Sequence, residues 1–165
     1  TIEKPFIAMV NAVAAGAGVN LMLACDLVYA SETARFTEAF AKVGLIPDCG
    51  GLFFLSRAVG LQKAKELMFT GDIIDAAQAE KIGLITKALP PSWLSEHVYD
   101  MADRLAQGAP LALAGMKRYL NNDSLTLDDI LAVETEEQPK LMGTQDCQEG
   151  ISAFYEKRRP QFKGI

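Results

Sequence analysis

Three short segments carry residue types that could do chemistry, and the most suggestive of them contains an aspartate. Asp48 lies in Gly-Leu-Ile-Pro-Asp-Cys-Gly-Gly, residues 44–51, with Phe40 and Phe53 close by in the sequence. Apolar surroundings disfavour the charged form of an aspartate and raise its pKa, which suits a general base. A proline, an aspartate and glycines are equally typical of a turn in which the aspartate caps a helix. On spacing alone, the turn is the better interpretation.

A Gly-x-Gly segment is the second candidate. Residues 13–20 read Val-Ala-Ala-Gly-Ala-Gly-Val-Asn and follow a strand-like stretch. Gly16 and Gly18 would let the backbone approach a ligand closely, with free N–H groups at a helix start. Such donors bind anions, or an oxygen that gains negative charge during a reaction. Tight packing of a glycine turn explains the segment equally well, and the third glycine of a dinucleotide-binding motif is absent.

The third candidate is the C-terminal tail, where aromatic and basic side chains alternate. Phe154 and Tyr155 are followed by Lys157, Arg158 and Arg159. Such a set could stack on a base and hold phosphate groups. It would also suit the solvated end of a helix, where basic side chains complement the helix dipole. The tail alone favours neither interpretation.

Composition limits the function classes. The chain has 165 residues, half of them hydrophobic, and a net charge of −5, which argues against a nucleic-acid binder. Three well-separated cysteines and a single histidine, His97, make a zinc site improbable and predict free thiols in a reducing compartment such as the cytoplasm. Residues 5–25 carry no charge, which a membrane span would explain. Two asparagines and two glycines in this run favour a buried strand followed by a buried helix.

These segments need strands and helices to position them. We expect four strands, at residues 6–13, 26–30, 35–37 and 84–88. In the first half of the chain we expect helices at residues 18–25, from residue 52 onward, at 61–69 and at 76–82. In the second half we expect helices at residues 92–107, at 110–120, after residue 126 and at 146–157. Asp75 is predicted to cap the N-terminus of the helix at residues 76–82, and Gly83 to end that helix. Thr126 and Asp129 are predicted to form a capping box at the start of the helix after residue 126, and Pro139 could kink that helix. His97 is expected on a helix surface. The layout is α/β or α+β.

Taken in this order, the segments resemble the crotonase (enoyl-CoA hydratase/isomerase) superfamily over nearly all 165 residues. The resemblance implies an α/β fold: a spiral of ββα units, here residues 1–90, followed by a helical region, residues 91–165, that makes trimer contacts and often a dimer of trimers. The chain opens at Thr1 rather than methionine, and the family's earlier strands and one oxyanion donor are missing. We therefore expect a piece of a longer protein.

The resemblance also implies roles for particular residues. The backbone N–H of Ala17 matches one of two donors that hold a thioester oxygen, and Asp48 matches an aspartate of isomerase-like members. The chain looks nearest to the 1,2-epoxyphenylacetyl-CoA isomerases. The implied substrate-binding residues are Gly16, Gly18, Asn20, Phe40 and Gly51, and Phe154 and Lys157 would contact coenzyme A bound to a neighbouring subunit. Coenzyme A would belong to the substrate, with no metal or other cofactor.

Departures from the family pattern point away from hydration. Hydratases have glutamates at the positions of Asn20 and Phe40, so the resemblance implies that this chain lacks the acid/base pair that adds water. We therefore predict an acyl-CoA isomerase in which Asp48 takes and returns one proton. The alternatives are hydratase-like chemistry, a dehalogenase- or hydrolase-like member in which Asp48 is the nucleophile, a non-catalytic subunit that binds CoA thioesters, and a membrane segment.

Overall fold

The computed structural model describes residues 2–165, which form two compact units. One unit is Phe6–Met101, and the other is Ala102–Ile165 with the described residues before Phe6. The division falls inside helix α5, Pro91–Ala106, whereas the sequence suggested a change of region at residues 90 and 91. All the candidate residues between Gly16 and Gly51 belong to the first unit.

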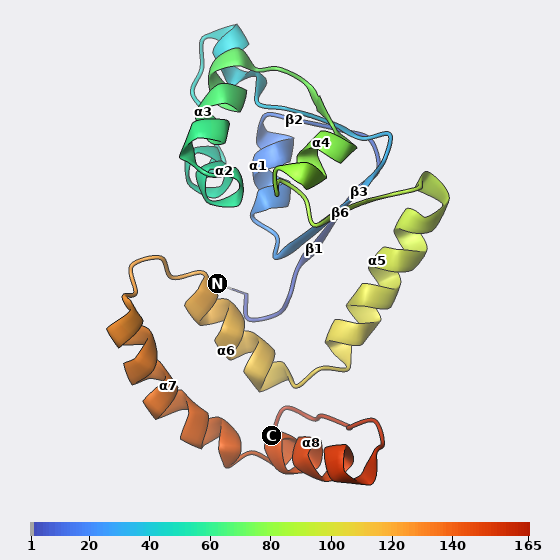
Figure 1. Ribbon diagram of the computed structural model, residues 1–165, viewed down its shortest axis with the longest axis vertical. Coiled ribbons are helices and arrows are strands. Elements are labelled where there is room, and N and C mark those ends of the chain that lie inside the picture. Colours follow the sequence, from blue (N-terminus) through green and yellow to red (C-terminus); the bar gives the residue numbers. More distant parts are fainter. Residues whose placement is uncertain (1) are drawn as a thin grey trace. The chain divides into compact units, whose positions relative to one another are not determined.

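Strands of the first unit form two small sheets (Figure 1). The first sheet has the order β1-β3-β6 and is parallel, and its strands are Ile7–Val10, Leu27–Ser31 and Lys87–Leu89. The second sheet has the order β2-β4-β5, and its strands are Val13–Ala15, Arg35–Thr37 and Ile74–Asp75. β2 pairs with β4 in parallel, and β4 pairs with β5 antiparallel. Successive passes of the chain thus add strands to both sheets, as in a spiral of ββα units.

The single strand predicted over residues 6–13 is two strands in the structure. β1 ends at Val10 and β2 begins at Val13, and the two belong to different sheets. The chain bends at Asn11 and Ala12 to pass from one sheet to the other. Hydrophobicity alone cannot show such a bend, because both strands are apolar. The strand predicted at residues 84–88 begins later, at Lys87, because Leu84 and Ile85 pack into the core.

Helices of the first unit lie close to their predicted ranges. They are α1 Ala17–Leu23, α2 Gly51–Val59, α3 Leu61–Thr70 and α4 Ala76–Lys81. Asp75 caps α4, its carboxylate accepting from the Gln78 N–H, and Gly83 adopts a left-handed conformation just after the helix, so both predictions are confirmed. A 3₁₀ helix at Ala39–Val43 was not predicted.

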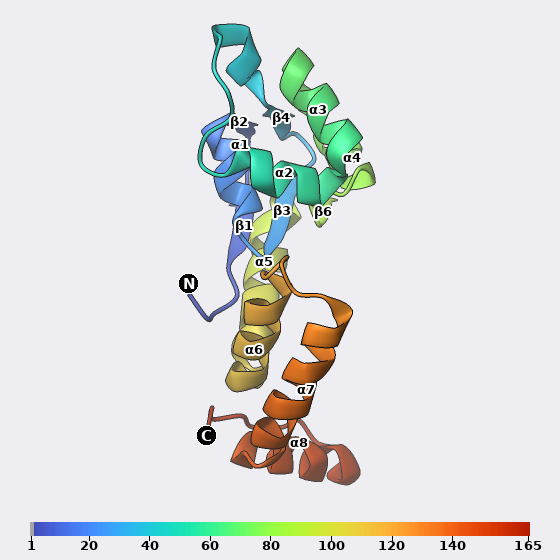
Figure 2. The same ribbon diagram turned by 90° about the vertical axis from the view of Figure 1, so that its left-hand side faces the viewer.

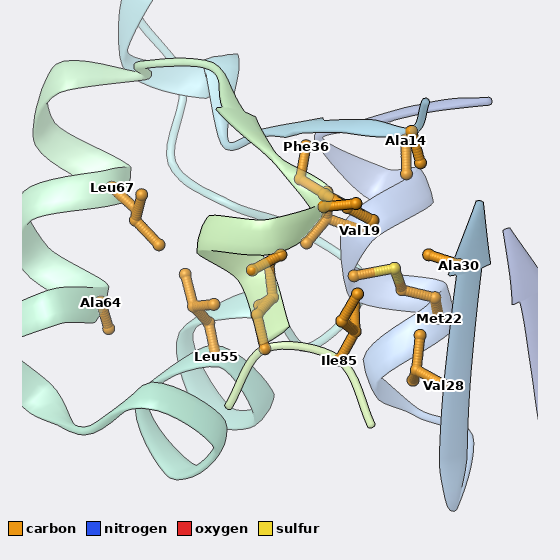
Figure 3. Packing of buried hydrophobic residues seen from close by; sticks show 14 of the residues in the cluster. Ala14, Val19, Met22, Val28, Ala30, Phe36, Leu55, Ala64, Leu67 and Ile85 are labelled. Carbon is orange, nitrogen blue, oxygen red and sulfur yellow. The ribbon is translucent and has the colours of Figure 1, made fainter. Parts of the chain in front are cut away.

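The larger of two apolar clusters among the described residues holds these elements together. Val19 and Met22 of α1 pack with Phe36 of β4 and Leu55 of α2, and all four are buried (Figure 3). The charge-free run therefore supplies two strands and a helix with one buried face; the strand–helix order is as predicted, but the predicted full burial is wrong, because Val13 of β2 and Leu21 of α1 are exposed. Among the described helices, none has the length and apolar character needed to span a membrane.

The remaining helices follow one another along the chain (Figure 2). They are α6 Pro110–Leu120, α7 Leu127–Met142 and α8 Gln145–Glu156. The capping box of Thr126 and Asp129 is confirmed, and Pro139 lies within α7, which continues to Met142. The expectation for His97 was wrong: its ring is half-buried in α5 and packs edge-on against Tyr29 with centroids 4.9 Å apart.

Candidate active site

The start of α1 is shaped by a glycine. Gly16 is the N-cap residue, with φ of 51°, and its N–H donates to the Thr37 carbonyl oxygen at 2.9 Å. A Cβ at this position would lie 3.1 Å from the Phe40 ring and would have to adopt a left-handed backbone. Gly16 therefore lets the chain turn from β2 into α1 beside β4. The Ala17 N–H is one of the donors that the first turn of a helix leaves without an intrahelical acceptor.

Asp48 lies on the loop between the 3₁₀ helix and α2. The loop begins after Gly44 and ends at Gly50, the N-cap of α2, and both glycines are left-handed. The Asp48 side chain is exposed in this chain. Next to it, Cys49 has φ of 47°, an uncommon conformation for a residue with a Cβ. A hydrogen bond to the Asp48 carboxylate, together with desolvation, raises the pKa of the Cys49 thiol.

Asn20 ties this loop to α1. Its side chain is fully buried, and its Nδ2 donates to the Asp48 carbonyl oxygen at 2.9 Å. The Gly51 N–H donates to the same oxygen, also at 2.9 Å. A Cβ at Gly51 would overlap the Asn20 side chain, so any larger residue there would have to displace Asn20. Asn20, Asp48 and Gly51 are thus brought together, and Asn20 anchors the loop through its amide.

A buried glutamate was missed by the sequence reasoning. Glu38 directly follows β4 and is only 2% exposed, and neither of its carboxyl oxygens has a hydrogen-bond partner among residues 2–165. Burial and, secondarily, the negative charge of Asp48 raise its pKa to about 7. Glu38 does not occupy either of the two positions that the family resemblance assigned to glutamates, which hold Asn20 and Phe40, so it is a further carboxyl group of the first unit. Strand alternation could have found Glu38, since it shares a face with the core residue Phe36.

The proposed coenzyme A contacts belong to the other unit. Phe154 is 80% exposed at the end of α8, and Lys157 is an exposed residue in a left-handed conformation. Arg158 is occupied, because it forms two hydrogen bonds to Glu149, at 2.5 and 2.8 Å, and one to Glu156. This pairing lowers the pKa of Glu149 to about 2. Of the basic run, Lys157 forms no ion pair within the described chain.

Metal chemistry finds no support in the described residues. In residues 2–165 no group of three histidine, cysteine, aspartate or glutamate side chains is arranged to hold a metal ion. The three cysteines are free thiols, with Cys49 exposed and Cys25 and Cys147 half-buried.

Comparison with known proteins identifies relatives over the whole chain. A model of the family described as enoyl-CoA hydratase/isomerase matches residues 1–165. A probable mitochondrial enoyl-CoA hydratase of Dictyostelium discoideum is 41% identical over 160 residues, which are 96% of this chain and 58% of that protein. The 1,2-epoxyphenylacetyl-CoA isomerase of Escherichia coli is 40% identical over 164 residues, which are 99% of this chain and 63% of that protein. The percentage of sequence identity to these relatives therefore does not distinguish whether this chain is more similar to hydratases or to isomerases.

The fold is confirmed by solved structures. An enoyl-CoA hydratase from Bacillus anthracis superposes with a TM-score of 0.96 at 34% identity, and the match covers all of this chain and 64% of that one. The fold is therefore that of the crotonase superfamily, as the motifs predicted. The chain spans somewhat less than two thirds of the length of these relatives.

Proposed function

Because the chain belongs to the enoyl-CoA hydratase/isomerase family, we propose that it moves a double bond within an acyl-CoA thioester and that Asp48 is the base. The observation that carries the proposal is the position of Asp48. Its carboxylate is exposed, while its carbonyl oxygen is held by the Asn20 amide and the Gly51 N–H. Asn20 lies three residues after Ala17 on α1. Its hydrogen bond therefore connects the loop that carries Asp48 to the helix whose first N–H group belongs to Ala17.

The chemistry requires one proton acceptor and one oxyanion donor. Asp48 would take a proton from the carbon next to the thioester, or from its vinylogous position, and return it at another carbon. The Ala17 N–H would donate to the thioester oxygen as that oxygen gains negative charge. A single carboxylate suffices, since the proton that leaves is the proton that returns. No metal or redox cofactor enters this scheme, and coenzyme A is part of the substrate.

Hydration is a second candidate, favoured by one observation. Glu38 gives the first unit a further carboxyl group, and its burial raises its pKa to about 7, a value that suits acid/base catalysis near neutral pH. Relatives of this chain include hydratases as well as isomerases. Against hydration, the two positions of the family's glutamates hold the amide of Asn20 and the ring of Phe40, neither of which can accept a proton from water.

One experiment separates the two reactions. The protein is incubated with an enoyl-CoA in deuterated, ¹⁸O-labelled water, and the products are analysed by mass spectrometry. An isomerase gives a product with a shifted double bond, no added oxygen and at most exchanged deuterium. Incorporation of ¹⁸O as the main outcome would replace the isomerase proposal by hydration. Binding of the thioester without any turnover would instead favour a non-catalytic binding subunit.

Lys157→Glu is expected to weaken binding of CoA thioesters by roughly tenfold or more, since a charge-assisted hydrogen bond to phosphate contributes about 1.5–3 kcal/mol. Lys157 is exposed and forms no ion pair among the described residues, so the substitution should cost at most about 1 kcal/mol of stability, through the charge at the end of α8. Affinity is measured by isothermal titration calorimetry. Arg159→Glu, which changes the net charge equally two residues further on, is the control. Equal affinities of the two variants would remove Lys157 from the proposed site.

Self-association through the helical region is part of the proposal. Large apolar side chains of α6 and α7 are exposed in this chain, namely Leu111, Met116, Leu120, Leu127 and Leu131. Exposed apolar area of this extent is typical of a surface that a partner covers. We expect trimers, or dimers of trimers, in sedimentation equilibrium at micromolar concentration. A monomer under these conditions would contradict the expectation.

A further inference from the structure

The end of α8 holds a lysine in a conformation that glycine normally takes. Lys157 has φ of 54°, in the left-handed region, and its N–H donates to the Phe154 carbonyl oxygen at 3.3 Å. The next N–H, that of Arg158, donates to the Ala153 carbonyl oxygen at 3.1 Å, which completes a Schellman turn. A residue with a Cβ is disfavoured in this conformation, and such strain persists only where the surrounding structure holds it.

Glu149 of α8 is the first group that holds the chain beyond the turn. The chain after Lys157 folds back along the helix (Figure 1), and the Glu149 carboxylate accepts the Gln161 N–H at 2.8 Å. The same carboxylate accepts two hydrogen bonds from the Arg158 guanidinium, at 2.5 and 2.8 Å. Glu149 therefore fixes both the residue directly after Lys157 and a residue three positions further on.

Asp146, one turn earlier on α8, holds the chain a second time. It is only 5% exposed, and its two carboxylate oxygens accept the Lys163 N–H at 2.6 Å and the Gly164 N–H at 2.8 Å. Between these bonds the Phe162 ring packs on the helix, 3.4 Å from the point where a Cβ of Gly150 would stand. Asp146, Glu149 and residues 158–164 together form what we call the tail clasp.

We propose that Asp146 and Glu149 are positioning residues: the tail clasp keeps the turn at Lys157 in its strained form, so that Lys157 and Phe154 are already placed to meet the nucleotide end of coenzyme A. The inference rests on the proposed function, in which these two side chains contact coenzyme A bound to a neighbouring subunit. Neither carboxylate touches the ligand. Phe154 is 80% exposed, and Lys157 forms no ion pair among residues 2–165, so both side chains can take up the contact.

The clasp matters for affinity because the turn would not keep its shape alone. Without the bonds of Asp146 and Glu149, the backbone of Lys157 would leave the left-handed region, which its Cβ disfavours. A ligand would then have to order the turn again on binding, and that ordering reduces affinity. A preformed turn avoids this cost, so the strain at Lys157 is explained by what the turn presents.

Amide hydrogen exchange of the intact protein tests the clasp without any ligand. The N–H groups of Gln161 and Lys163 are expected to be protected in the wild type. Glu149→Ala should lower the protection of Gln161 several-fold while α8 stays helical, since alanine suits a helix. Glu134→Ala, which removes the same charge from an exposed glutamate of α7, is the control. Exchange of these amides in the wild type at the rate of an unstructured peptide would overturn the clasp.

The affinities of two thioesters test the positioning role. Butyryl-CoA has no double bond to move, and butyryl-pantetheine carries the same acyl arm without the nucleotide and its phosphates. The wild type is expected to bind butyryl-CoA more tightly in isothermal titration calorimetry. Glu149→Ala should reduce this preference by about two- to tenfold, the cost of ordering a flexible side chain on binding. Asp146→Asn, which keeps the size of the buried side chain, should act in the same direction.

The ratio of the two dissociation constants separates positioning from general damage, because a purely structural loss weakens both thioesters alike. An unchanged ratio in Glu149→Ala, despite faster exchange of Gln161, would overturn the positioning role. Tighter binding of butyryl-CoA by this variant would also overturn it, since the pair with Glu149 would then be withholding Arg158 from the ligand. Equal affinities of the wild type for both thioesters would instead contradict the proposed coenzyme A contact, whereas the clasp would still be visible in the exchange data.

Discussion

Asp48→Asn is expected to lower the rate of double-bond migration by about 10²- to 10⁴-fold, the usual loss when a general base is removed. Asparagine keeps the size of aspartate but cannot take the proton. Thioester affinity should stay near that of the wild type, because the lost interaction is made in the transition state. Stability should also be preserved, because the Asn20 amide and the Gly51 N–H donate their hydrogen bonds to the backbone carbonyl oxygen of Asp48, and the substitution leaves that oxygen in place.

Three measurements decide the role of Asp48: migration rate by absorbance, thioester affinity by calorimetry and the unfolding midpoint by circular dichroism. Asp72→Asn makes the same chemical change at an exposed aspartate outside the site and should behave as the wild type in all three. If Asp48 is only a turn residue, asparagine replaces it well, and the rate would barely change. That result would contradict the proposed mechanism.

Gly51→Ala is expected to destabilise the first unit by about 1–3 kcal/mol, the usual cost of forcing extra volume into a packed site. The new Cβ would overlap the amide of Asn20, which is fully buried and holds the Asp48 loop. Displacement of Asn20 should also move Asp48 and reduce the rate. Urea unfolding measures the first effect and the migration assay the second.

The matched control for Gly51→Ala is Gly18→Ala, a glycine of α1 around which a Cβ would meet nothing within 4 Å. The stability of the Gly18→Ala variant should equal or slightly exceed that of the wild type. Asn20→Ala combined with Gly51→Ala should cost less than the sum of the two single changes, because the smaller side chain at residue 20 removes the overlap. Strict additivity would show that the overlap is not the cause of the destabilisation.

Features that depend on neighbours in the sequence could be predicted from the sequence alone. The caps at Asp75 and Thr126, the stop at Gly83 and most helix ranges rest on contacts within one or two turns, and the structure confirms them. The order of the glycine segment, the Pro-Asp loop and the tail was enough to recognise the superfamily. The roles of Asp48, Ala17, Phe154 and Lys157 remain predictions of that resemblance.

Only the tertiary structure decided which polar groups are buried and what surrounds them. Asn20 and Asp48 are 28 residues apart, and their hydrogen bond depends on the packing of α1 beside α2. The raised pKa of Glu38 arises mainly from its burial among side chains of six separate segments, and no local pattern encodes that enclosure. The break between β1 and β2 and the partial burial of His97 have the same origin. Burial is a property of the assembled core, whereas caps and turns are properties of the local chain.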